Sequence, residues 1–185
     1  MKQQLEEFYS YKNKNGDPCN ELPDDIRASI MDIGAFKGAW GDIVLAKSPN
    51  VNLYLIEPLK SACKILKDKF NNYPNVNIIN VGVGIDDERV IAYESKDGTS
   101  QLNWTNKGKP VDFTVKRIDD IFNDLNIDSI DLVQINIEGA EYDILDDWIK
   151  SGNIKLFKSI QIQFHNEPIG PKDSDDRVIS IRKGL

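Results

Sequence analysis

The sequence predicts a three-layer α/β fold, in which a mostly parallel β-sheet lies between two layers of helices. Short runs rich in Ile and Val alternate with amphipathic segments along most of the 185 residues, a pattern typical of βαβ units. The runs are apolar almost throughout, as expected for strands that are buried on both faces. Right-handed crossovers between parallel strands then place helices on both faces of the sheet.

Five runs are predicted to form the sheet: residues 28–33, 51–56, 76–81, 130–137 and 159–164. Apolar residues at helical spacing predict helices between them, over residues 40–47, 59–70 and 142–149. Residues 89–93 and 111–116 are predicted to pair as an antiparallel insertion, and residues 95–110 between them are predicted to be a loop.

Length and composition predict one globular domain over residues 26–185, preceded by a helix and loop extension over residues 1–25. No run approaches the roughly 20 apolar residues of a membrane span, and the N-terminus has no secretory signal pattern. Cys19 and Cys63 lack metal-ligand spacing. We therefore expect a cytoplasmic protein with free thiols and no membrane contact. The net charge of −7 argues against nucleic-acid binding.

The turn after the first strand reads Asp32-Ile33-Gly34-Ala35-Phe36-Lys37-Gly38. A carboxylate leaves the strand here, and two glycines frame a tight turn into a helix, where the backbone can approach a ligand closely. A purely structural turn would also use glycines. The motif is neither the dinucleotide-binding G-x-G-x-x-G nor a G-x-x-x-x-G-K-[ST] phosphate loop.

Two other strands end in polar residues at the same predicted edge. The second strand ends in Glu57-Pro58, where a carboxylate can accept both hydroxyls of a ribose; the alternative is a solvated loop residue. The fourth strand leads into Asn136-Ile137-Glu138-Gly139-Ala140-Glu141. Helix capping explains acidic residues in a first helical turn, but it does not explain Asn136 and Glu138 at the strand end.

These motifs resemble those of the FkbM-type methyltransferases. DLVQINIEGAE (131–141) is similar to the family's fourth-strand motif D-L-[IV]-K-I-D-[IV]-E-G-A-E. MDIGAFKGAW, Leu55–Pro58 and VKRIDDIF (115–122) resemble three further family motifs, so the resemblance covers about residues 30–165. It implies a class I, Rossmann-like fold that uses S-adenosylmethionine to methylate, usually, a hydroxyl oxygen on a small molecule or sugar.

The resemblance also implies roles for individual residues. The methionine part of the cofactor is expected at the first turn, the ribose after the second strand, the adenine after the third, and the methyl-transfer end after the fourth. The corresponding residues are Asp32, Gly34, Ala35, Phe36 and Gly38; Glu57 and Pro58; Gly82 and Val83; and Asn136 and Glu138.

Two departures from the family pattern affect these expectations. Gln134 and Asn136 stand where the family usually has Lys and Asp. The amide of Asn136 can accept a hydrogen bond from the methionine ammonium, but it cannot act as a base. A complete class I sheet has seven strands, yet 21 residues follow Phe164. Either the sheet is incomplete, or the insertion strands pair with its edge, or the chain is a fragment.

His165 follows the fifth predicted strand and is the only histidine. It is a candidate general base, because an imidazole titrates near neutral pH; the alternative is a loop histidine bonded to the backbone. With Glu138 and Glu167 it could also offer metal ligands, but the spacing matches no metal motif and we expect no metal.

The sequence therefore predicts a methyltransferase with Glu138 and His165 as catalytic residues, S-adenosylmethionine as cofactor and a small hydroxyl-bearing acceptor. The alternative is an S-adenosylmethionine-binding module without activity, acting as a regulatory or partner subunit. A nicotinamide-dependent oxidoreductase is less favoured, because the pyrophosphate-binding glycines are absent from the turn.

Overall fold

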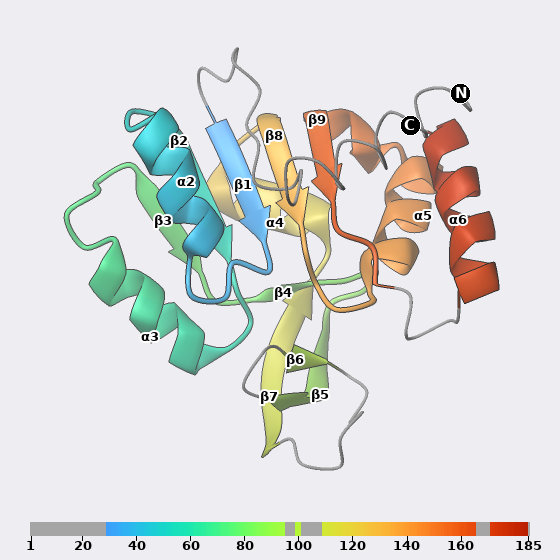
Figure 1. Ribbon diagram of the computed structural model, residues 1–185, viewed down its shortest axis with the longest axis horizontal. Coiled ribbons are helices and arrows are strands. Elements are labelled where there is room, and N and C mark those ends of the chain that lie inside the picture. The colour runs from blue at the N-terminus through green and yellow to red at the C-terminus, as the bar shows by residue number, and fades with distance from the viewer. Residues whose placement is uncertain (1–28, 95–98, 101–108, 166–170, 185) are drawn as a thin grey trace.

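The computed structural model describes residues 29–94, 99–100, 109–165 and 171–184. Its main sheet has five strands, all parallel, in the order β3-β2-β1-β8-β9 (Figure 1). The strands are β1 (Ser29–Ile33), β2 (Asn52–Ile56), β3 (Val76–Ile79), β8 (Ile130–Ile135) and β9 (Phe157–Ile162). The predicted fold class is confirmed, and each strand overlaps its predicted run.

The largest difference lies at β9, which begins two residues before the predicted run. Phe157 is buried there, with its ring stacked on Trp148 at 4.9 Å and edge-on to Phe122 at 5.5 Å. Aromatic packing against two helices therefore decides where this strand begins, and the hydrophobic pattern of the strand alone does not contain that information.

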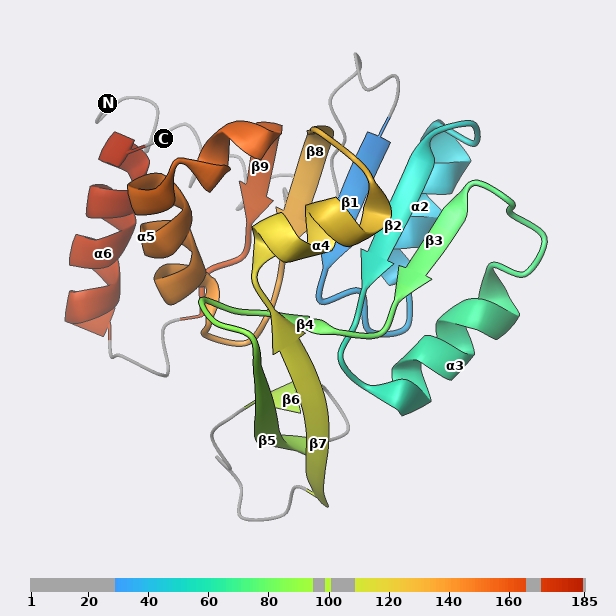
Figure 2. The same ribbon diagram turned by 180° about the vertical axis from the view of Figure 1, so that it is seen from behind.

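Helices cover both faces of the sheet (Figures 1 and 2). Two helices pack on one face and three belong to the core cluster of the other. They are α2 (Ala39–Lys47) and α3 (Lys60–Lys69), then α4 (Ile118–Leu125), α5 (Glu141–Ser151) and α6 (Pro171–Gly184). Helices α4 and α6 were not predicted: α4 has only eight residues, and α6 is mostly polar, with Ile181 as its buried contact to the core.

Successive side chains of the central strand, β1, point to opposite faces of the sheet and therefore pack into two separate core clusters. Ile30 of β1 packs with α2 and α3, whereas Met31 and Ile33 pack with α4 and α5. All three side chains are at most 1% exposed. Burial on both faces explains why the central strand reads as a continuous apolar run.

A second, smaller sheet lies beyond the carboxyl ends of the main strands (Figure 1). Its order is β4-β7-β5-β6, with β4 (Gly82–Val83), β5 (Glu88–Glu94), β6 (Thr99–Ser100) and β7 (Lys109–Lys116). The predicted antiparallel pairing is confirmed in β5 and β7. The predicted loop over residues 95–110 was wrong in part, because β6 and the start of β7 lie within it and residues 95–98 and 101–108 lie outside the described residues.

The insertion strands pair with one another and with β4, so they do not extend the main sheet at either edge. Helix α6 follows β9 in the described part of the chain and contacts α5. The predicted extension over residues 1–25 lies outside the described residues. None of the helices in the described ranges is long and apolar enough to cross a membrane.

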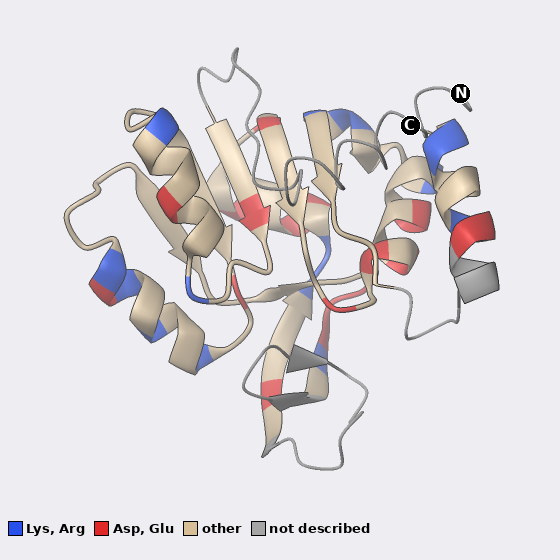
Figure 3. Ribbon diagram, in the orientation of Figure 1, with Lys and Arg blue, Asp and Glu red and all other residues tan. Residues whose placement is uncertain are grey.

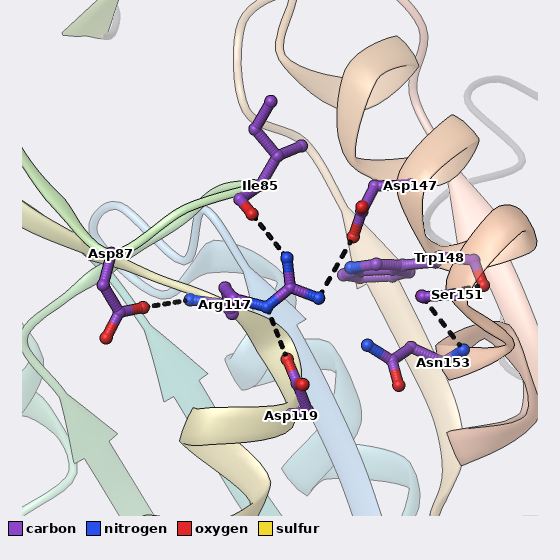
Figure 4. Close-up of polar contacts among 8 residues, drawn as sticks. All are labelled: Ile85, Asp87, Arg117, Asp119, Asp147, Trp148, Ser151 and Asn153. Atoms are coloured by element: carbon purple, nitrogen blue, oxygen red, sulfur yellow. Dashed lines mark hydrogen bonds and ion pairs between the residues drawn. The ribbon is translucent and has the colours of Figure 1, made fainter.

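Arg117 connects the small sheet to the helical layer (Figure 4). Its guanidinium donates to the backbone oxygen of Ile85 at 2.6 Å and forms ion pairs with Asp119 at 3.2 Å and Asp147 at 3.7 Å. Its backbone N–H donates to Asp87 at 2.8 Å. The planar guanidinium can serve several partners in different directions. One side chain thereby holds the β4–β5 loop against the N-terminus of α4 and against α5.

Gly34 is the point of closest approach between the loops that follow β1 and β8. A Cβ atom at Gly34 would lie 2.0 Å from the backbone oxygen of Asn136, and the residue has φ +89°. Gly152, at the end of α5, has φ +86° and nothing within 4 Å of the same position. The two glycines share a backbone conformation but differ in their surroundings.

We expect Gly34→Ala to lower the free energy of unfolding by about 3 to 5 kcal/mol, since it combines left-handed backbone strain with a contact that the main chain must move to relieve. Gly152→Ala should lower the free energy of unfolding by only about 1 to 2 kcal/mol, because it adds backbone strain without a close contact. Urea unfolding of both variants measures the difference. Equal losses would show that the two loops can separate without cost.

Candidate active site

The strand order of the main sheet reverses between β1 and β8. The chain runs outward from β1 to β2 and β3, and later returns to β8 and β9 on the other side of β1. In open α/β sheets, ligands bind beyond the carboxyl ends of the strands at such a switch point. The turn after β1 and the loop after β8 flank this point, and they carry half of the predicted site residues.

Asp32 and Glu57 form a pair of buried carboxyl groups at this edge. Asp32 lies in β1 and is 2% exposed, and Glu57 directly follows β2 and is 4% exposed. Burial, and secondarily the negative charge of Glu57, raises the pKa of Asp32 from 3.8 to about 7. Burial disfavours the charged form of a carboxyl group, so this edge would favour a ligand that brings positive charge.

Glu57 holds the turn after β1. Its carboxylate accepts hydrogen bonds from the backbone N–H groups of Phe36 and Leu59, both at 2.8 Å. Phe36 has φ +45°, an uncommon conformation for a residue with a side chain. Each carboxylate oxygen can accept more than one hydrogen bond, so a contact with a ribose stays a prediction for Glu57. The backbone role was not foreseen from the sequence.

Asn80, which the sequence analysis missed, connects the ends of β2 and β3. Its amide donates to the backbone oxygens of Glu57 at 3.0 Å and Pro58 at 2.8 Å. The thiol of Cys63 donates to the same Glu57 oxygen at 3.1 Å. Burial is the main cause that raises the pKa of Cys63 to about 11, and an inert structural thiol is the result.

Four further residues that were predicted to bind the cofactor are buried or closely packed. Ala35 is buried beside the turn. A Cβ at Gly38 would lie 2.6 Å from the Phe70 ring, so this glycine lets α2 pack on α3. Gly82 and Val83 are buried in β4, which pairs with β7. Adenine binding at Gly82 and Val83 stays a prediction.

Asn136 lies directly after β8, opposite the turn. Its backbone N–H donates to Ile33 at 3.0 Å, but its side-chain oxygen is buried with no hydrogen-bond partner among the described residues. Gln134, two residues earlier, is paired in register with Asp32, and its side-chain oxygen is also buried and unpartnered in that part of the chain. A buried polar atom without a partner is costly, so these acceptors point to a ligand that donates hydrogen bonds.

The loop from β8 to α5 is a strained turn. Glu138 has φ +59° and Gly139 has φ +110°. Glu141, at the start of α5, accepts hydrogen bonds from the backbone N–H of Ile137 at 3.0 Å and of Gly139 at 2.8 Å. Backbone strain persists only where the surroundings hold it. Glu141 supplies that support, and the side chain of Glu138 is left 41% exposed at the edge.

His165 follows β9 and lies against the same loop. Its Nδ1 is 2.7 Å from Oε1 of Glu141, and its Nε2 is 3.7 Å from Oε1 of Glu138. The structure therefore brings the two predicted catalytic residues together. Glu141 completes the group; its acidic side chain was attributed only to helix capping in the sequence. Glu167, the third ligand considered for a metal, lies outside the described residues.

A pocket of about 330 Å³ lies between the end of β3, β7 and α4, and Asn80 is among the residues that line it. Lys116 and Asp124 at its rim form an ion pair of 2.5 Å. None of the predicted site residues lines it. The polar groups at the carboxyl edge, rather than this pocket, therefore define the candidate site.

The site can thus bind a cation and move a proton. Figure 3 shows acidic residues on the loops at the carboxyl edge. Asp32 lies in β1, Glu57 and Asn136 directly follow β2 and β8, and His165, which follows β9, lies near Glu138 of the loop after β8. Hydrogen-bond acceptors gathered at such a point suit a ligand that carries an ammonium group.

Comparison with known proteins identifies a family. The profile of the methyltransferase FkbM domain matches residues 32–181. A curated relative, the 2-O-methyltransferase NoeI of Sinorhizobium fredii, is 22% identical over 143 residues. That match covers 68% of this chain and 58% of the relative, so the chain spans less than two thirds of the relative's length.

A solved structure shows the same fold class. Fibrillarin of Aeropyrum pernix, in complex with natively bound S-adenosyl-L-methionine, superposes with a TM-score of 0.53 at 10% identity, over 98% of this chain and 64% of that chain. A methyltransferase FkbM from Methylobacillus flagellatus has a TM-score of 0.49 at 16% identity, over 75% of this chain and 32% of that one.

The raised pKa of Asp32 predicts a pH-dependent stability. Between pH 3.8 and about 7 the native chain keeps a proton that the unfolded chain has released, so this group lowers the free energy of unfolding as pH rises through that window. Asp32→Asn removes the titration. We expect the stability of the variant relative to wild type to increase from pH 4 to pH 8 by up to about 4 kcal/mol, at about 1.4 kcal/mol per pKa unit.

Urea unfolding at several pH values measures this difference. Asp128→Asn, which removes a carboxyl group at an exposed position before β8, is the control. A difference between Asp32→Asn and wild type that stays constant across the window would mean that Asp32 is ionised throughout.

Proposed function

Since this chain belongs to the FkbM methyltransferase family, we propose that it binds S-adenosylmethionine at the carboxyl edge of β1, β2 and β8 and methylates a hydroxyl group of a small molecule or sugar. S-adenosylmethionine is the cofactor of this family. The methyltransferase domain is proposed to span residues 26–185, and the family match over residues 32–181 supports these limits.

The unpartnered side-chain oxygen of Asn136 carries the proposal. It is buried at the switch point, next to the turn after β1, where an ammonium group could donate a hydrogen bond to it. Asp32 and Glu57 add carboxyl groups at the neighbouring strand ends, and burial disfavours ionisation of Asp32 unless a positive charge lies beside it. The methionine part of the cofactor carries an ammonium and a sulfonium, so its charge complements this edge.

When bound, S-adenosylmethionine supplies an electrophilic methyl group: the acceptor oxygen forms a bond to it as the carbon–sulfur bond breaks, leaving S-adenosylhomocysteine. The protein mainly has to align the acceptor with this methyl group, which is a proximity effect. The imidazole of His165, near Glu138, is proposed to accept the hydroxyl proton. Transfer to oxygen is supported by the name of the curated relative, a 2-O-methyltransferase.

The first test is cofactor binding. We expect wild-type protein to bind S-adenosylhomocysteine in isothermal titration calorimetry, and Asn136→Ala to bind it about 10-fold more weakly, since a charge-assisted hydrogen bond is lost. Thermal stability of Asn136→Ala should not fall, because removing an unpaired buried acceptor breaks no bond within the protein.

Asn52→Ala is the matched control, since Asn52 is exposed at the opposite end of β2. It should bind the cofactor as wild type does. Glu57→Ala is a poorer probe, because its loss also frees the backbone N–H of Phe36 in the turn and that of Leu59 before α3. Equal affinity in wild type and Asn136→Ala would remove Asn136 from the cofactor site.

The second test is methyl transfer. We expect radiolabelled methyl groups to pass from S-adenosylmethionine to at least one acceptor in a panel of sugars, polyols and phenols. His165→Ala should lower kcat by about 10² or more, the usual contribution of a general base, while S-adenosylhomocysteine affinity is retained. Tight cofactor binding with no product across the panel would instead support the silent cofactor-binding module.

A further inference from the structure

Glu141 is a fully buried carboxylate with three hydrogen-bond partners among the described residues. Its side chain is 0% exposed. Oε2 accepts from the backbone N–H of Gly139 at 2.8 Å, and Oε1 accepts from that of Ile137 at 3.0 Å and also contacts Nδ1 of His165 at 2.7 Å. Burial of a carboxylate is costly unless donors surround it, so each of these contacts matters to the fold.

Two of the three contacts are local. The backbone N–H groups of Ile137 and Gly139 belong to the loop before α5 and lie within four residues of Glu141. His165 lies 24 residues further along the chain and arrives from the end of β9. The contact therefore joins two adjacent strand ends across the candidate site.

The contact determines which nitrogen of the imidazole carries the proton. A carboxylate oxygen has no proton to donate, so it can only accept a hydrogen bond from the ring. Nδ1 is therefore the donor. In the neutral ring Nε2 is then the acceptor. Nε2 lies on the side of Glu138, whose Oε1 is 3.7 Å away, a distance beyond a direct hydrogen bond.

We propose that Glu141 is the positioning residue of this site: through Nδ1 it holds His165 in the tautomer whose Nε2 faces the exposed edge beside Glu138. As a statement about catalysis this rests on the proposed function. When the acceptor hydroxyl attacks the methyl group, its proton passes to Nε2 and the ring becomes an imidazolium. The negative charge of Glu141 compensates that cation, and the proton leaves to solvent after the transfer.

The same carboxylate also sets the loop that carries Glu138. The backbone N–H groups that donate to Glu141 belong to Ile137 and Gly139, the residues on either side of Glu138. Glu138 itself is held at φ +59°. One buried group thus fixes both the ring and the backbone beside it. A loop shift and a ring rotation are expected to occur together when Glu141 is changed.

Nuclear magnetic resonance can test the tautomer directly, because His165 is the only histidine in the chain. In ¹⁵N-labelled protein, at a pH high enough that the ring signals no longer change with pH and the imidazole is neutral, long-range ¹H–¹⁵N couplings report which ring nitrogen is protonated. We expect Nδ1–H in wild type, the reverse of the form that free histidine favours in water. Nε2–H in wild type overturns the proposal without any variant.

Variants then separate positioning from structure. Glu141→Gln should lose the Nδ1–H form, whereas Glu138→Gln, which removes the carboxylate near Nε2, should keep it. With an acceptor in hand, Glu141→Gln should lower kcat about 10²-fold, with little change in KM for the acceptor or in S-adenosylhomocysteine affinity. A folded Glu141→Gln that keeps Nδ1–H and full kcat would falsify the positioning role.

Cofactor affinity, measured on the same samples, keeps the two proposals distinguishable. Wild type with Nδ1–H but without S-adenosylhomocysteine binding contradicts the proposed function and leaves the Glu141–His165 positioning supported. Wild type that binds the cofactor but shows Nε2–H contradicts the positioning and leaves cofactor binding supported.

Discussion

A carboxylate buried away from water must be surrounded by hydrogen-bond donors, and this constraint organises the carboxyl edge of the sheet. Glu57 meets it with the backbone N–H groups of Phe36 and Leu59. Glu141 meets it with those of Ile137 and Gly139. Each glutamate thereby holds one loop in a left-handed conformation that the loop would not keep by itself. The loop after β8 in turn carries Asn136 and Glu138.

Buried polar groups that the fold does not stabilise indicate a functional rather than a structural role. The side-chain oxygens of Gln134 and Asn136 are buried without partners among the described residues, and burial raises the pKa of Asp32 to about 7. A folded chain keeps such groups where another requirement outweighs the loss of stability. Their position at the switch point of the sheet agrees with binding of a positively charged ligand.

The division of labour among strands follows from these contacts. The amide of Asn136 cannot take up a proton, although it stands where the family usually has a carboxylate. The imidazole that can do so comes from the end of the neighbouring strand β9, where Glu141 contacts it at 2.7 Å. The proposed cofactor contact and the proposed proton transfer therefore lie at adjacent strand ends, and the small sheet lies beyond the same edge (Figure 1).

The sequence by itself determined the elements whose signal is local. Apolar runs predicted the five parallel strands, the glycines predicted the turn after β1, and the motifs predicted Asp32, Glu57, Asn136 and His165 as residues of one edge. Only the tertiary structure decided which contacts these residues make. Glu141 looks like a helix cap in the sequence, since its partner His165 lies 24 residues away. Asn80, α4 and α6 were likewise missed, because their roles depend on packing between distant segments rather than on periodicity along the chain.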